Sequence, residues 1–540
     1  MLEYIRLDYD IGRRKAVIKC GNRLFATIRD HYSVPNPQAK AMRRFGNVHI
    51  PLSKYAITPT GRYNIGLTGD IFKWLVDRKI EYTVETTDKF NEAYNSRFDF
   101  DYHKGENIFE LKLALRDYQK IGVETVLDKG NGVFVYPTSA GKTLTIATSI
   151  ANILQRKPDS KILVVTLTHL VSQFYSDFVN DYGMDSSKVS MWTGENKFTE
   201  TPVVIAGNSI LCTQLKNIDK EIIKLKNLMS ALAGKTDKKS IAASKEASEE
   251  IERLRLKIPE NRVMKRYFDS VYALFVDEVH QCKSGNNITD MFDYIKTKHT
   301  FGFTGTLPND KIDEWTVLGL VGPVRQIVER DKLVKDGRIT DVFVQFIDLH
   351  YLNRPQYTTL ESSTSMLDNF RIESEFLYSS NFRNTVITRI AAGTPKNILI
   401  LVDRIEHGET LKELISKEAP NKHVTFINGE VEEDDREQIK SLMESNNDVV
   451  CIAITKIFST GVNIKNIHYL MFANAWKTRV SIIQSIGRGV RMMENKSRVV
   501  LFDIHDCLKY GEKHYIERRK IYENEHFTCA NKEFREQPSK

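Results

Sequence analysis

The strongest constraint in this sequence is an apolar run that leads through a turn of small residues into Gly141, Lys142 and Thr143. The run Val133–Tyr136 has the composition of a short buried strand. Backbone N–H groups in such a turn bind phosphate oxygens, helped by the N-terminus of the helix that follows. A strand, a phosphate-binding turn and a helix in this order predict an α/β fold with a parallel sheet.

The Gly-Lys-Thr triplet has defined chemical tasks if the turn binds a nucleotide. Lys142 would reach the β and γ phosphates of ATP, and Thr143 would hold a magnesium ion. Tyr136 stands where the general motif has its first glycine. A second triplet at 234–236 follows a helical stretch rather than a strand, so the triplet can also arise by chance. We therefore assign phosphate binding to the first triplet alone.

A second apolar run ends in two acidic residues, Asp277 and Glu278. A carboxylate at a strand end beside the phosphate-binding turn can hold the magnesium ion, and Asp277 takes that role. Glu278 would polarise the attacking water as general base, and His280 would face residues 304–306 or a second lobe. An isolated acidic pair is more often a solvated turn, but its place after a phosphate-binding turn favours catalysis.

Short apolar runs alternate with helical stretches over two long segments, residues 109–320 and 321–505. This is the pattern of parallel sheets covered by helices on both faces. The expected strands lie at 132–136, 161–167, 202–206 and 272–276 in the first segment, and at 397–402, 423–427, 449–454 and 469–472 in the second.

Residues 1–105, the N-terminal module, are expected to form a small mixed α/β domain with strands at 16–18 and 24–28 and a helix at 38–45. The first 80 residues hold 15 Lys and Arg against 6 Asp and Glu, whereas the whole chain holds 78 against 70. This asymmetry indicates a basic domain that binds a polyanion, and a solvated surface is the plainer alternative.

Two further segments depart from the alternating pattern. Residues 214–265 are rich in Lys, Glu, Ala and Ser, with apolar residues three and four apart. This pattern predicts a helical hairpin inserted in the first alternating segment, residues 109–320. Residues 506–540 predict a helical C-terminal tail. The six cysteines form no Cys-X-X-Cys pair and no apolar run could span a bilayer. We therefore expect no zinc site, no disulfide framework, no membrane partner and a cytoplasmic location.

Seven short motifs follow one another in order, and together they resemble those of superfamily 2 DExH-box helicases. They span Leu115–Gln119, 137–143, Thr166–Gln173, Asp277–His280, Phe303–Leu307, Ser459–Ile464 and Gln484–Arg491. The resemblance implies two tandem RecA-like lobes that hold ATP between them, and an enzyme. It implies catalytic roles for Lys142, Asp277, Glu278, Arg488 and Arg491. It implies ATP contacts by Gln119, Pro137, Thr138, Ser139, Ala140, Gly141, Lys142, Thr143, Gly461, Asn463 and Gln484.

Arg488 and Arg491 lie three residues apart, which places them on one face of a helix. Presented from the second lobe, they would neutralise the charge that develops on the γ phosphate. Hydrolysis would then depend on closure of the lobes, which converts ATP turnover into stepping. A surface arginine pair is the alternative, and the phosphate-binding turn argues against it.

The resemblance also assigns nucleic-acid contacts and residues that couple them to ATP. The nucleic-acid contacts are Arg43, Arg44, Thr168, His169, Gln173 and Thr460, and the coupling residues are His280, Thr304 and Thr306. One position departs from the pattern, because Gly207 stands where motif Ib usually has a threonine. The N–H of Gly207 or the side chain of Asn208 could make that contact instead.

Within the superfamily the chain resembles the UvsW-type phage recombination helicases. The similar segments are the basic N-terminal module with Val34–Pro37 and Arg43–Gly46, the lobe junction Leu333–Gly337, and the tail from Asp503. The resemblance implies ATP-driven unwinding and branch migration of forks, Holliday junctions and R-loops in recombination, repair and replication, in the host cytoplasm if the chain is phage-encoded. The oligomeric state stays open, with a monomer favoured. Two alternatives stay open: an RNA helicase or duplex translocase, and a non-catalytic nucleic-acid-binding scaffold.

Overall fold

The computed structural model divides the chain into two compact units. The first unit comprises Met1–Tyr136 and Gly141–Val328, and the second comprises Pro137–Ala140 and Glu329–Lys540. The described residues are 2–11, 15–36, 39, 51–137, 140–211, 243, 245–246, 249, 266–284, 287–295, 297–308, 310–356, 363–428, 441–455, 466–473, 498–524 and 527–538. No helix among these residues is long and apolar enough to cross a membrane.

The N-terminal part of the first unit is a four-stranded mixed sheet in the order β5-β2-β1-β6. Strand β1 pairs antiparallel with β2 and parallel with β6. The strands are β1 (Glu3–Asp10), β2 (Lys15–Cys20), β5 (Arg62–Tyr63) and β6 (Tyr82–Thr86), with β3 (Ser33–Pro35) and β4 (Ser53–Tyr55) as a separate pair. The helices are α1 (Asn22–His31), α3 (Thr68–Asp77) and α4 (Asp88–Tyr94).

The strand predicted at 24–28 is wrong, because these residues belong to helix α1. Leu24 and Ile28 are the buried residues of this helix, one turn apart, so their spacing of four fits a helical face rather than alternating strand positions. The strand predicted at 16–18 is confirmed within β2. The helix predicted at 38–45 lies outside the described residues except for Ala39.

The rest of the first unit is a seven-stranded parallel sheet, the first lobe, in the order β13-β7-β12-β11-β8-β10-β9. Its strands are β7 (Gly132–Val135), β8 (Lys161–Thr166), β9 (Val189–Trp192), β10 (Val203–Gly207), β11 (Val271–Asp277), β12 (His299–Thr304) and β13 (Val324–Ile327). Its helices are α5 (Asp117–Lys129), α6 (Lys142–Arg156), α7 (Val171–Ser176), α11 (Met291–Tyr294) and α12 (Lys311–Val321). The four strands predicted here are confirmed.

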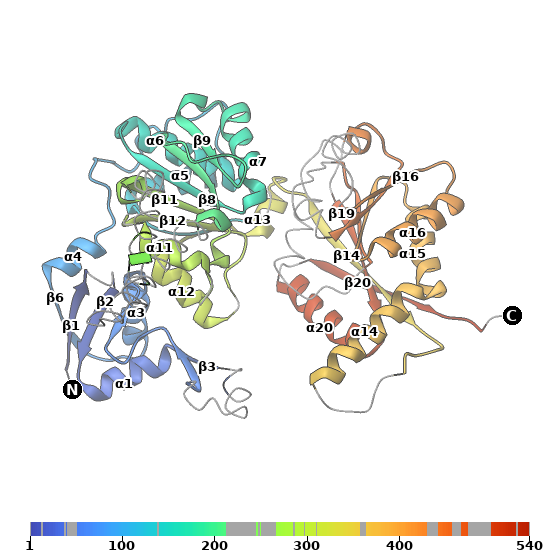
Figure 1. Ribbon diagram of the computed structural model, residues 1–540, viewed down its shortest axis with the longest axis horizontal. Coiled ribbons are helices and arrows are strands. Elements are labelled where there is room, and N and C mark those ends of the chain that lie inside the picture. Colours follow the sequence, from blue (N-terminus) through green and yellow to red (C-terminus); the bar gives the residue numbers. More distant parts are fainter. Residues whose placement is uncertain are drawn as a thin grey trace. The chain divides into compact units, whose positions relative to one another are not determined.

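The second unit contains another seven-stranded parallel sheet, the second lobe, in the order β16-β17-β15-β18-β19-β14-β20. Its strands are β14 (Asp341–His350), β15 (Ile398–Val402), β16 (His423–Ile427), β17 (Val449–Ile454), β18 (Tyr469–Phe472), β19 (Arg498–Asp506) and β20 (Thr528–Arg535). Its helices are α13 (Arg330–Lys335), α14 (Ser363–Ser379), α15 (Asn381–Gly393), α16 (Ile405–Glu418) and α20 (Lys509–Asn524). Two parallel-sheet lobes with a small α/β domain confirm the predicted fold class (Figure 1).

The C-terminal tail is only partly helical. Helix α20 confirms the prediction for its residues, but the chain then forms β20, which pairs parallel with β14 from Phe343↔Thr528 to His350↔Arg535. The sequence of β20 alternates poorly, and its backbone pairing with a long neighbouring strand decides its conformation. The predicted hairpin at 214–265 lies outside the described residues apart from 243, 245–246 and 249.

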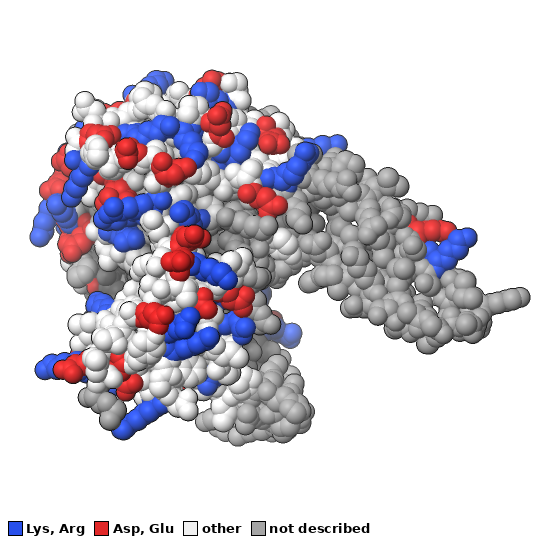
Figure 2. Space-filling view, turned by 90° about the vertical axis from the view of Figure 1, so that its left-hand side faces the viewer, with Lys and Arg blue, Asp and Glu red and all other residues white. Residues whose placement is uncertain are grey.

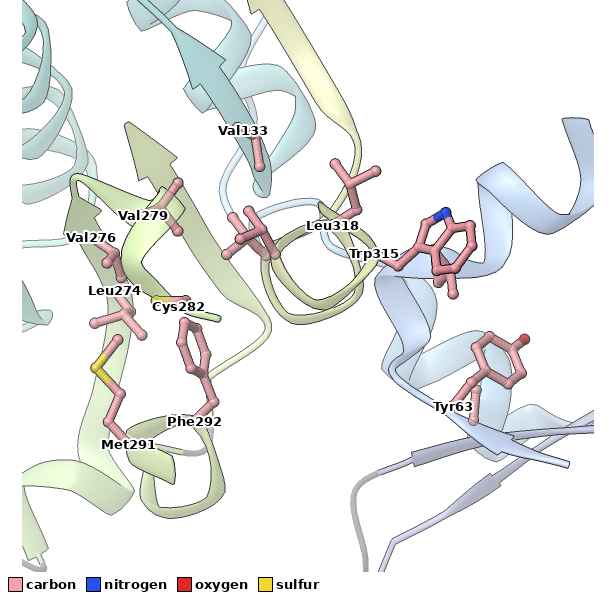
Figure 3. Close-up of a cluster of buried hydrophobic side chains, with 14 of the residues drawn as sticks. Tyr63, Val133, Leu274, Val276, Val279, Cys282, Met291, Phe292, Trp315 and Leu318 are labelled. Atoms are coloured by element: carbon pink, nitrogen blue, oxygen red, sulfur yellow. The ribbon is translucent and has the colours of Figure 1, made fainter. Parts of the chain in front are cut away.

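Helix α12 joins the core of the first lobe to the N-terminal module. Trp315 and Leu318 of this helix lie between the lobe residue Val133 and Tyr63 of the module (Figure 3). The backbones also approach closely, since a Cβ added at Gly66 would lie 2.3 Å from the carbonyl oxygen of Leu318. The buried cluster is therefore continuous across the two parts of the first unit.

Candidate active site

The predicted phosphate-binding turn connects β7 to α6, which begins at Lys142. Gly141 has a φ of +79°, and a Cβ there would lie 2.4 Å from Nε2 of Gln119. Both observations require glycine at this position. The N–H of Ala140 donates to the carbonyl of Pro137 at 3.1 Å, while Thr138 and Ser139 lie outside the described residues.

Tyr136 has a structural task that explains why it replaces the usual glycine. Its side chain is fully buried, and its hydroxyl donates to Oε1 of Gln326 at 2.7 Å. Gln326 in turn donates through Nε2 to the carbonyl of Tyr118 at 2.9 Å. Tyr136 therefore ties the turn to α5 and to the edge strand β13, a connection that the sequence did not reveal.

Lys142 lies between the two acidic residues that follow β11. Its Nζ is 2.8 Å from Oε1 of Glu278 and 4.0 Å from Oδ1 of Asp277. The carboxyl ends of β7 and β11 lie on the same edge of the parallel sheet, with β12 between them. The structure thus brings together three of the residues predicted to be catalytic, from positions 135 residues apart.

The two carboxyl groups titrate in opposite directions. Burial raises the pKa of Asp277 to about 6, and the neighbouring Glu278 adds to that rise, while Lys142 opposes it. Burial also acts to raise the pKa of Glu278, but the charge of Lys142 and the hydrogen bond with His280 outweigh it and hold the pKa at about 2. Glu278 is therefore the ionised partner of Lys142.

One carboxylate oxygen of Asp277 is free to bind a magnesium ion. Its Oδ2 accepts a hydrogen bond from Thr166 at 3.2 Å, whereas Oδ1 is buried and has no hydrogen-bond partner among the described residues. A single carboxylate with a free oxygen fits Mg²⁺, which keeps several water and phosphate ligands. Thr143 lies in the first turn of α6, so the residues present fit the ion. Thr166, at the end of β8, was not predicted to act here.

His280 connects the acidic pair to residues 304–306. The hydroxyl of Thr304 donates to the carbonyl of Thr306 at 2.8 Å, so its oxygen must accept the proton of His280 Nδ1, which lies 2.8 Å away. The same Nδ1 is 3.2 Å from Oε2 of Glu278. Glu278 itself adopts a left-handed conformation with φ of 49°, which is strained for a non-glycine residue. One histidine proton therefore bridges the proposed general base and the predicted coupling residues.

Gln119 is buried rather than presented on the surface. Its Nε2 donates to the carbonyl of Gly141 at 3.1 Å, and its Oε1 accepts from the N–H of Arg116 at 2.9 Å. The structure places Gln119 against the phosphate-binding turn, so an adenine contact by this residue stays a prediction.

The predicted motif Ia residue Thr168 lies at the carboxyl end of the sheet beside Asn208 and Ser209. Its hydroxyl donates to Oδ1 of Asn208 at 3.2 Å and shares a short hydrogen bond with Ser209. A Cβ at Gly207 would lie 2.8 Å from Oγ1 of Thr168, which explains why this chain has glycine where a threonine is usual. Gln173 follows in α7.

Several predicted site residues lie outside the described residues, so their placement stays a prediction. These are Arg43, Arg44, Thr138, Ser139, Thr460, Gly461, Asn463, Gln484, Arg488 and Arg491. The backbone of His169 lies in the short helix Thr168–Leu170.

Two family models match this chain. Residues 112–309 match the family model described as the res subunit of type III restriction enzymes, and residues 380–493 match the helicase conserved C-terminal domain. The first match contains Lys142, Asp277 and Thr304, and the second contains Arg488 and Arg491.

Among individual proteins, the ATP-dependent DNA helicase UvsW of Enterobacteria phage T4 is 24% identical over 442 residues, covering 77% of this chain and 76% of that protein. The crystal structure of T4 UvsW aligns over 99% of this chain and all of that chain, with a TM-score of 0.43 and 20% identity. Dbp5 of S. cerevisiae, solved with RNA and ADP BeF3, aligns over 78% of this chain and 90% of that chain, with a TM-score of 0.47 and 10% identity. Because the chain matches both family models and is similar to UvsW over most of its length, it is a superfamily 2 helicase that resembles UvsW.

Proposed function

We propose that this helicase is a DNA-stimulated ATPase that unwinds or branch-migrates branched DNA, such as forks, Holliday junctions and R-loops, in recombination, repair and replication. The observation that carries the proposal is the burial of Lys142 against Asp277 and Glu278 at the carboxyl edge of a parallel sheet. This cluster contains the cation, the metal ligand and the base that hydrolysis of a nucleoside triphosphate needs.

The Lys142–Glu278 ion pair must open during turnover. The ammonium group of Lys142 turns to the β and γ phosphates when ATP binds, and the Glu278 carboxylate is released. Because the charge of Lys142 lowers the pKa of Glu278, loss of that charge raises the pKa and makes Glu278 a stronger base. Glu278 then accepts the proton of the attacking water. A magnesium ion held by Asp277 and Thr143 would neutralise phosphate charge.

The remaining predicted residues complete the proposal. Arg488 and Arg491 neutralise charge on the γ phosphate, while Gly461, Asn463 and Gln484 contact the nucleotide. His280, Thr304 and Thr306 transmit the state of the γ phosphate to Thr168, Gln173 and Thr460, which bind the nucleic-acid backbone. Residues 1–105, with Arg43 and Arg44, supply further phosphate contacts through charge.

DNA is favoured over RNA as the substrate because one relative, UvsW of phage T4, which matches 77% of this chain, is named a DNA helicase. The basic N-terminal module supports a polyanionic partner of either kind. An RNA helicase or a duplex translocase is the second candidate, and a DExH box fits it equally.

The test is steady-state ATPase activity without nucleic acid and with single-stranded DNA, forked DNA, a four-way junction or RNA. Branched DNA should stimulate hydrolysis most, and Lys142→Ala should abolish it. Lys417→Ala, which removes an exposed lysine of α16, is the matched control and should behave as the wild type. Stimulation by RNA alone would replace the DNA assignment with RNA unwinding. Absence of ATP hydrolysis under every condition would refute the proposal that the protein is an ATPase.

Strand displacement separates the two motor activities. Release of a labelled strand from forked DNA supports unwinding, whereas ATP turnover without release on the same substrate would identify a duplex translocase.

A further inference from the structure

A cavity lies far from the candidate active site, between the N-terminal module and the amino-terminal edge of the first-lobe sheet. It has a volume of about 1060 Å³ and includes the residues that begin β11 and β12, Val271 and His299. Lys142 and Asp277 lie at the other edge of this sheet. Since strands rise about 3.3 Å per residue, the length of β12 separates the two sites by roughly 17 Å. This groove is therefore distinct from the nucleotide site.

Both parts of the first unit form the walls of the groove. The module contributes Lys15, Asn64 and Tyr94, and the first lobe contributes Lys298 and Arg325. The segment that connects the two parts, residues 95–99, also lines it. Any ligand in the groove would contact the module and the motor lobe together.

The groove has an excess of positive charge. Its lining includes five Lys and Arg side chains but a single carboxylate, Asp99. That carboxylate is already engaged, because hydrogen bonds from Lys157 and Tyr272 lower the pKa of Asp99 to about 2. Asp128, which precedes the lining residue Lys129 in the sequence, pairs with that lysine at 2.7 Å. Asp99 is thus bound to Lys157 and Tyr272, and Asp128 is bound to Lys129 while its charge also acts on Arg325.

Three of the cations form no ion pair with a carboxylate among the described residues, so their charge can attract an anion. Arg325 donates through Nε and Nη2 to the carbonyl and side chain of Asn131, at 3.0 and 2.8 Å, so neutral groups fix it without cancelling its charge. Within the described part of the chain, no carboxylate pairs with the guanidinium of Arg97 or the ammonium of Lys298. Figure 2 shows one face of the molecule, on which Lys and Arg side chains are interspersed with Asp and Glu.

We propose that this groove binds one single strand of nucleic acid, held against the N-terminal module while the motor works. Its volume of about 1060 Å³ slightly exceeds the roughly 300–1,000 Å³ typical of small-molecule pockets, which favours an extended ligand. Cations along the groove match the phosphates of a strand, and the ring of Tyr94, 46% exposed, offers a surface for a base. A base can stack on Tyr94 only when it is unpaired, so the occupant is a separated strand.

The inference rests on the proposed function, since a helicase generates separated strands. It goes further by naming the residues that hold one of them. Leu320 and Val321 at the end of α12 also line the groove, and α12 begins at Lys311, five residues after Thr306. A strand in the groove would therefore contact the helix that leads from the predicted coupling residues.

The decisive measurement is the affinity for labelled oligothymidylate at several salt concentrations, for wild type and for Arg97→Glu, Lys298→Glu and the double variant. Each lost phosphate contact should reduce the slope of log affinity against log salt by about 0.7, and the double variant should bind at least about tenfold more weakly. Lys298→Gln, which removes charge without reversing it, should show a smaller loss. Lys417→Glu makes the same charge change on an exposed helix and should keep wild-type binding. Melting temperatures confirm that each variant is folded.

The position of the strand is tested by photo-crosslinking a strand that carries iodouracil, with the attached peptide identified by mass spectrometry. Attachment at Tyr94 supports the proposal. Variants that bind like Lys417→Glu, or a crosslink only at Thr168 or Gln173, would overturn it while leaving the proposed function intact. A wild-type protein that neither binds oligothymidylate nor hydrolyses ATP would instead refute the proposed function. Competition by inorganic tripolyphosphate at charge-matched concentration would show a small-anion site and would also overturn the strand proposal.

Discussion

The ammonium group of Lys142 lies 2.8 Å from Oε1 of Glu278, so the proposed phosphate ligand and the proposed general base neutralise each other. This pairing stabilises two buried charges in the absence of nucleotide. It also blocks both functions, since Lys142 cannot bind phosphate and Glu278 cannot accept a proton while they remain paired. Nucleotide binding must compete with the ion pair.

Glu278→Gln separates these two effects. The amide cannot accept a proton from water, so kcat for ATP hydrolysis should fall by about 10²- to 10⁴-fold. Because Lys142 loses its anionic partner, ATP affinity should stay equal to or exceed that of the wild type. Equilibrium binding of a fluorescent ATP analogue and steady-state kinetics measure both quantities. Lys142→Ala is the comparison, since it should lose affinity as well as turnover. Near-normal turnover by Glu278→Gln would remove Glu278 from the role of base.

His280→Ala tests the bridge between Glu278 and Thr304. Nδ1 of His280 lies 2.8 Å from Oγ1 of Thr304 and 3.2 Å from Oε2 of Glu278, so loss of the imidazole should reduce the stimulation of ATPase by DNA more than the basal rate. Thr304→Val should act through the same contact. The double variant should therefore be non-additive, with a coupling energy of about 0.5–3 kcal/mol. Additive effects on stimulated kcat would show that the two residues act independently.

The buried parallel strands could be predicted because their sequences are continuous apolar runs. Strands β7, β8, β11, β15, β17 and β18 each match a predicted run within a residue or two. The predicted roles at Lys142 and Asp277 depended on those strands, since a motif gains meaning from the strand before it. The structure adds that parallel order brings both residues to one edge of the sheet.

What escaped prediction depends on contacts between distant residues. Tyr136 bonds to Gln326, 190 residues away, and no local pattern indicates that β7 and β13 are neighbours. Strand β20 is defined by its pairing with β14 rather than by apolar alternation. The strand prediction for residues 24–28 was wrong for a local reason, because five residues are too few to distinguish a helical from an extended apolar pattern.

Gly207→Thr would restore the residue usual in motif Ib, yet we expect it to impair the protein. A Cβ at this position lies 2.8 Å from Oγ1 and 3.0 Å from Cα of Thr168, so Thr168 must move and its contact with Asn208 is lost. The free energy of unfolding should fall by about 1–3 kcal/mol, and affinity for single-stranded DNA should fall with it. Chemical denaturation and anisotropy measure these effects. Gly194→Ala, where a Cβ meets nothing within 4 Å, should be neutral. Unimpaired DNA binding by Gly207→Thr would mean that Thr168 makes no contact there.

His299 should make the protein sensitive to acid. Burial, aided by the charge of Lys298, lowers the pKa of His299 from its usual 6.5 to about 4. The unfolded chain therefore takes up this proton at a higher pH than the folded chain does. Stability is full above pH 6.5 and decreases as the pH falls toward 4, by about 3 kcal/mol for this group. Denaturation at several pH values should show a smaller decrease for His299→Gln than for the wild type, and equal decreases would contradict the assignment.

Gly319 tests whether the module and the first lobe depend on close backbone packing. An alanine in a helix interior normally stabilises by about 0.5–1 kcal/mol over glycine. At Gly319, however, a Cβ would lie 2.6 Å from Cβ of Asn64 in the module, so Gly319→Ala must push the module away from α12 and should destabilise. The same change at Gly393, where a Cβ meets nothing within 4 Å, should be neutral or stabilising.

The free energy of unfolding should therefore fall in Gly319→Ala and stay equal or rise in Gly393→Ala. This contrast separates the effect of packing from that of helix propensity. Limited proteolysis should release the module from Gly319→Ala by cleavage within 95–105 sooner than from the wild type, while Gly393→Ala is cleaved at the wild-type rate. DNA stimulation of ATPase should fall in Gly319→Ala if the module contributes to substrate binding. Stabilisation by Gly319→Ala would show that the module shifts freely on α12, and the continuous core of Trp315 and Leu318 would then not fix its position.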